Sequence, residues 1–87
     1  MKKMSLQEIL AREKEKRTEG GMFGIRECKD SIIHHIEKNE MLNRRAQENV
    51  YPTSLYVLLE EYVNRANNDV FFNRAMVLAC WELINEQ

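Results

Sequence analysis

Residues 70–84 read VFFNRAMVLACWELI in a chain of 87 residues. Wound as a helix, this stretch has apolar side chains on nearly every side. Such a helix is either central in its fold or covered by a second subunit. Because the chain offers only three substantial helices, we expect the second arrangement, a homo-oligomer and preferably a dimer. The expected interface residues are Phe71, Phe72, Met76 and Trp81.

Three breaks divide the chain into four segments, of which residues 70–84 are the last. The breaks are the glycines at 20–24, the single proline Pro52, and the polar cluster at 67–69. The segments between the breaks have helical rather than strand periodicity. They predict an all-α fold, a small bundle of three main helices at about 22–47, 53–66 and 70–84. The last two should be antiparallel neighbours, because the turn between them is short. We expect residues 21–87 to form the helical domain and residues 1–20 to form a flexible, amphipathic N-terminal arm.

The arm contains a short predicted helix from about Ser5 to Arg17. Ser5 and Glu8 have the spacing of a capping box, and an apolar face follows at positions i, i+3 and i+4 before a charged, solvated tail. A short amphipathic helix on a glycine hinge is typical of ligands that bind in a groove of another protein. The residues expected to bind a partner are Leu6, Ile9, Leu10, Met22 and Phe23. Two alternatives remain open: the segment closes this chain's own core, or it is disordered.

The charges are nearly balanced, with 13 basic and 14 acidic residues and a net charge of −1. No global field therefore favours nucleic acid or acidic lipid. The chain has neither the apolar run of a signal peptide nor the roughly 20 apolar residues of a membrane span. Cys28 and Cys80 lie within apolar helical patterns, as buried free thiols do. We therefore expect a protein that does not enter a membrane and lies in the cytoplasm, or in the host cytoplasm if it is viral.

The residue types that carry chemistry occur in patterns that do not favour catalysis. His34 and His35 are adjacent on a helix, so they point about 100° apart and cannot share one metal ion. Cys80 has an apolar setting, which makes a thiol unreactive. The glycines at 20–24 lack the ending of a phosphate-binding loop. We expect no catalytic residue, no metal and no cofactor, and a protein that is not an enzyme.

The sequence favours a non-enzymatic protein-binding regulator, adaptor or inhibitor whose partner is a protein. Its short length and its composition suit a bacterial or bacteriophage accessory protein that antagonises a host protein. The alternative is a nucleotide- or nucleic-acid-binding helical oligomer, in which basic groups hold phosphates and aromatic rings stack on bases. The residues expected to serve this alternative are Lys38, Arg44, Arg45, Tyr51 and Tyr56.

Overall fold

A computed structural model describes residues 3–18, 24–42 and 51–86 of the chain. These ranges contain the helices α1 (Leu6–Thr18), α2 (Ile25–Leu42), α3 (Tyr51–Asn68) and α4 (Ala75–Asn85), and no strand. The prediction of a small all-α bundle is confirmed. Helix α3 begins earlier than expected, with Pro52 in its first turn, where the missing N–H of proline is tolerated.

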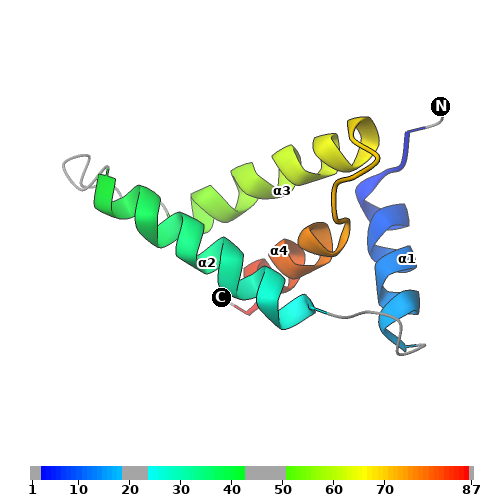
Figure 1. The fold of residues 1–87 in the computed structure, drawn as a ribbon, viewed down its shortest axis with the longest axis horizontal. Helices are drawn as coiled ribbons and strands as arrows, with labels where there is room; N and C mark the ends of the chain where they lie inside the picture. The colour runs from blue at the N-terminus through cyan, green and yellow to red at the C-terminus, as the bar shows by residue number, and fades with distance from the viewer. Residues whose placement is uncertain (1–2, 19–23, 43–50, 87) are drawn as a thin grey trace.

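Helix α4 is the centre of the bundle. It packs against α1, α2 and α3, and Figure 1 shows it, in orange to red, with the other three helices around it. Its side chains at 75, 77–80 and 83 are buried. The first of the two explanations for an all-round apolar helix, a central position, therefore applies. The pattern of residues 70–84 no longer requires a second subunit to cover it.

The segment before α4 forms turns rather than the first turn of a helix, which corrects the expected start at Val70. Asp69 Oδ1 accepts a hydrogen bond from the Phe71 N–H at 2.9 Å, and the Asp69 carbonyl accepts one from the Phe72 N–H at 3.1 Å. Asn73 Oδ1 then accepts the N–H of Ala75 at 3.0 Å. Short polar side chains that bind nearby backbone groups compete with helix formation, so α4 begins only after Asn73.

Helix α1 packs on the same core as the other helices. The predicted capping box is present: the Ser5 N–H donates to Glu8 Oε1 at 3.1 Å, and the Glu8 N–H donates to Ser5 Oγ at 3.2 Å. Ile9 and Leu10 are only 0% and 3% exposed and join one hydrophobic cluster with α2, α3 and α4. The structure thus places them in this chain's own core, the first of the two open alternatives, and not on a face free to bind a partner.

The start of the chain is tied to the C-terminal end of α3 by one side chain. The Met4 N–H donates to Asn67 Oδ1 at 2.6 Å, and Asn67 Nδ2 donates to the Met4 carbonyl at 2.9 Å. The same amide nitrogen donates to the Val63 carbonyl within α3 at 3.1 Å. An amide that satisfies both groups of one peptide residue mimics a backbone pairing, which fixes where α1 begins relative to α3.

Two charged side chains of the bundle make ion pairs, one within a helix and one between helices. Glu13 is buried, with 3% exposure, and accepts a hydrogen bond from Lys16 Nζ at 3.2 Å. The expectation that the charged part of α1 is entirely solvated was therefore wrong at this position, because Glu13 continues the inward face of Ile9. Between α2 and α4, Lys29 Nζ lies 3.0 Å from a carboxylate oxygen of Glu82 and 2.7 Å from one of Glu86.

Candidate protein-binding site

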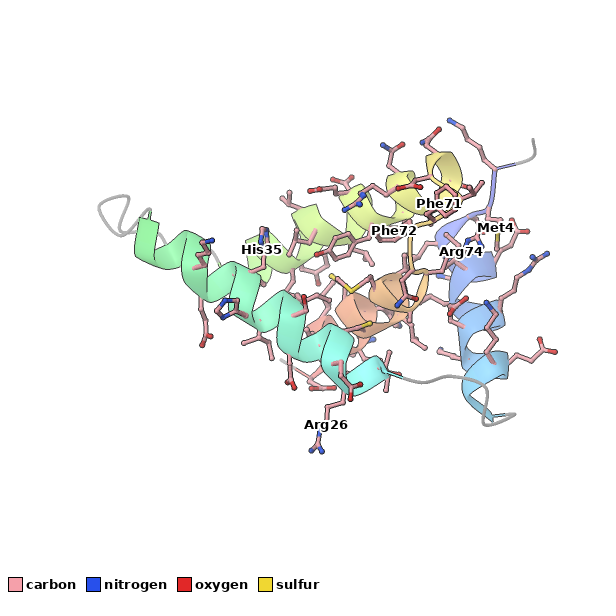
Figure 2. The ribbon with its side chains drawn as sticks, viewed as in Figure 1. Met4, Arg26, His35, Phe71, Phe72 and Arg74 are labelled. Atoms are coloured by element: carbon pink, nitrogen blue, oxygen red, sulfur yellow. The ribbon has the colours of Figure 1, made fainter. Side chains whose placement is uncertain are left out.

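Two apolar side chains stand in solvent on the turn between α3 and α4. Phe71 is 93% exposed and Val70 is 70% exposed. We refer to these two residues as the exposed turn. Figure 2 shows Phe71 with Phe72, Met4 and Arg74 at the end of the molecule where the chain begins and α3 ends.

The backbone of the exposed turn is fixed on both sides. On one side, the carboxylate of Asp69 accepts the Phe71 N–H. On the other side, the ring centroids of Phe72 and Tyr62 are 5.7 Å apart, and the guanidinium carbon of Arg65 lies 4.7 Å from the ring centroid of Phe72. Both are favourable aromatic contacts. Phe72 therefore packs toward the bundle while its neighbour Phe71 is directed away from it.

Arg74 adds a further link between the turn and α3. Its Nη2 donates to the carbonyl of Ala66 at 3.4 Å, which satisfies one of the acceptors left free at the end of a helix. Its Nε atom is buried and has no hydrogen-bond partner within the described part of the chain. The turn is thus joined to the last two turns of α3 by two side chains that follow Phe71, those of Phe72 and Arg74.

A groove lies between the beginning of the chain and α3, and we refer to it as the α1/α3 groove. Its volume is about 380 Å³, and the described residues that line it are Lys3, Leu6, Leu59, Glu60, Val63, Asn64 and Asn67. Leu59 is almost fully buried, and Leu6 and Val63 are half-buried against the core, so these three side chains make the walls apolar. Lys3, Glu60 and Asn64 are exposed around it. Sequence reasoning missed this groove, because it depends on where Met4 and Asn67 meet.

The structure separates the four residues expected at an oligomer interface. Met76 and Trp81 on α4, and Phe72 before it, are half-buried against this chain's own core. Only Phe71 is fully open to solvent. The expected partner-binding residues are also divided. Leu6 lines the groove, while Met22 and Phe23 lie outside the described residues.

The residues of the alternative phosphate- and base-binding patch are described only in part. Lys38 on α2 and Tyr56 on α3 are both exposed, and Tyr56 has 57% exposure. Arg44 and Arg45 lie outside the described residues, and so does the side chain of Tyr51. The described geometry therefore places two members of the patch, Lys38 and Tyr56, on different helices.

The two cysteines are free and buried. The Cys80 thiol donates a hydrogen bond to the carbonyl of Leu55 at 3.2 Å, and burial raises its pKa to about 12. Burial, followed by the nearby charge of Glu27, also raises the pKa of Cys28. Thiols of this kind are protonated at neutral pH and weak as nucleophiles. Among the described residues, no group of three His, Cys, Asp or Glu side chains is arranged to hold a metal ion.

Two further observations concern membrane spans and known proteins. Within the part that the structure describes, no helix has both the length and the apolar character needed to cross a membrane. In comparisons with known proteins, no family model matches the chain, and no curated protein or solved structure is significantly similar to it. The function proposed below therefore rests on the geometry of the exposed turn and the α1/α3 groove.

Proposed function

We propose that this chain is a non-enzymatic protein-binding module, a regulator, adaptor or inhibitor, whose recognition element is the exposed turn. The observation that carries the proposal is that Phe71, 93% exposed, stands on a backbone held by hydrogen bonds. Full burial of a phenylalanine side chain contributes about 1.5–3 kcal/mol, which the free protein forgoes. A partner with an apolar pocket recovers this free energy.

Single exposed apolar residues are common on protein surfaces and do not by themselves indicate a binding site. Phe71 differs from them because the backbone that carries it is held in place. Binding normally loses free energy because flexible groups become ordered in the complex. The carboxylate of Asp69 and the packing of Phe72 have already ordered this turn. Aromatic side chains are enriched at protein interfaces, and a few such residues supply most of the binding free energy. Val70 extends the apolar contact on the same turn.

Site-specific photocrosslinking tests the proposal. The photoreactive amino acid p-benzoylphenylalanine replaces Phe71 in one sample and Arg26 in another. Arg26 is the matched control, because it is also exposed but lies on α2, away from the turn (Figure 2). In cells of the source organism, we expect a discrete crosslinked protein from position 71 and none from position 26. Equal labelling from both positions, or none from position 71, would contradict the proposal.

The identity of the crosslinked protein separates the forms of this function. A bacterial or bacteriophage accessory protein that antagonises a host protein is the form suggested by the length and composition of the sequence. It requires that a host protein is crosslinked at position 71 and that its activity falls when the chain is added. The Phe71→Asp variant should lose this effect, because a charged side chain cannot enter an apolar pocket without a desolvation penalty.

A further inference from the structure

We infer that the exposed turn of one copy of this chain docks into the α1/α3 groove of a second copy, so that two copies associate through two equivalent contacts. The inference rests on the proposed function and names the partner of the same recognition element. Its first support is that one chain carries both halves of an apolar contact. Phe71 is 93% exposed, so it does not occupy the groove of its own chain.

The groove has the size and lining that the turn requires. Its volume of about 380 Å³ falls within the range of about 300–1,000 Å³ that is typical of sites for small ligands. The volume is sufficient for a phenyl ring. Leu6, Leu59 and Val63 provide apolar walls for the ring.

The positions of the two elements suit a twofold arrangement. Asn67 lines the groove and stands close in sequence to Val70, so groove and turn lie at the same end of the molecule. In a twofold dimer, each surface meets the other surface of the partner copy, and the contact occurs twice. A chain with a turn and a groove at one end can close such a dimer, leaving neither element of either copy open.

The charges of the two surfaces can pair across this contact. The groove is lined by the exposed Lys3 and Glu60, which have opposite signs. The exposed turn is flanked by Asp69 and lies beside Arg65, which also have opposite signs. Each surface can therefore place a basic group near an acidic group of the other. A net charge of −1 per copy adds little overall repulsion.

The size of the contact sets the expected strength of the dimer. Two small apolar contacts fall at the low end of protein interfaces, where association is weak and transient. We therefore expect a reversible monomer–dimer equilibrium that responds to protein concentration, measured by sedimentation equilibrium of the full chain over a wide range of loading concentrations. A chain that stays monomeric throughout this range overturns the inference.

Two exposed substitutions test the two halves of the contact without cutting into the core. Phe71→Asp removes the docking ring, and Asn64→Trp places a large side chain at the mouth of the groove. Each should weaken dimerisation by at least about 30-fold, the effect of losing a dominant interface contact. Ser31→Asp on α2 is the control, because it adds the same charge as Phe71→Asp at another exposed position. It should dimerise like the unmodified chain, and circular dichroism should show equal helix content in all variants.

Mixing the two damaged variants gives the sharpest result. A Phe71→Asp copy still has an open groove, and an Asn64→Trp copy still has its Phe71. Their heterodimer therefore regains one of the two contacts, whereas neither homodimer has any. We expect association in the mixture to exceed that of either variant alone, and no gain on mixing overturns the inference. If the chain is monomeric but position 71 crosslinks to a different protein, this inference fails and the proposed function stands; if position 71 crosslinks to nothing, both fail.

Discussion

Replacing Ile9 with alanine should remove a large part of the stability of this protein. Ile9 is 0% exposed and lies in the cluster that joins α1 to the other helices. The substitution deletes three buried carbon groups, each of which contributes about 0.8 kcal/mol, or about 2.4 kcal/mol together. Incomplete collapse of the resulting cavity raises the loss to about 3–4 kcal/mol. A domain of 87 residues has a free energy of unfolding of about 4–13 kcal/mol, so the effect is readily measured.

Urea denaturation followed by circular dichroism measures this loss. With an m-value of about 1–3 kcal/mol per molar urea, the midpoint should fall by roughly 1–4 M. Gln7→Ala is the matched control, because Gln7 is an exposed residue of the same helix and its loss should change stability by less than about 0.5 kcal/mol. If Ile9→Ala behaves like this control, α1 does not pack on the core. Ile9 would then be free to bind a partner, as the sequence pattern alone suggested.

Three further substitutions or reactions test particular contacts. Hydrogen bonds to Glu86, and next to Glu82, raise the pKa of Lys29 above its ordinary value of 10.5. The charged Lys29 therefore stabilises the folded state fully below pH 10.5, and this contribution to the free energy of unfolding is lost as the pH rises through the higher pKa of the folded state. In urea titrations at several pH values, the Lys29→Met variant should no longer lose this part of its free energy of unfolding at alkaline pH. The difference should be below about 1 kcal/mol, because the ion pairs are partly exposed. Because burial raises the pKa of Cys80 to about 12, this thiol should react with a chromogenic thiol reagent only when the protein unfolds; rapid labelling of the native state would contradict its burial. Ser5→Ala should lower the free energy of unfolding by about 1 kcal/mol, because it removes the capping hydroxyl, and an unchanged urea midpoint would contradict that role.

The features that the sequence predicted correctly depend on neighbours along the chain. The capping box needs only Ser5 and Glu8 at the right spacing, and the structure shows both of its hydrogen bonds. The helical segments follow from apolar periodicity and from breaks at glycine, proline and asparagine. Burial of Cys80 follows from its apolar neighbours in the central helix. Each of these signals acts within one or two helical turns, so a single sequence is sufficient to find it.

The features that the sequence did not predict depend on contacts between distant residues. The α1/α3 groove exists because the side-chain amide of Asn67 pairs with the backbone of Met4. No local sequence pattern around either residue predicts that hydrogen bonding. Glu13 lies in a run of charged residues and looks solvated, but the packing of α1 turns its side chain inward. The start of α4 was misplaced because the apolar pattern of residues 70–72 outweighed the turn-forming side chains of Asp69 and Asn73.

These misplaced features are connected, and together they change where an interaction surface is expected. The apolar excess of residues 70–84 argued for a partner on the face of the last helix only because α1 was treated as a detachable arm. Once Ile9 and Leu10 cover α4, its apolar residues are explained within one chain. Among the described residues, the two most exposed large apolar side chains are those of Phe71 and Val70, which belong to the turn and not to the helix; Val57 and Tyr56 on α3 are exposed to a lesser degree. A binding surface on this protein is therefore better sought at the α3–α4 turn, beside the groove that the docked α1 creates.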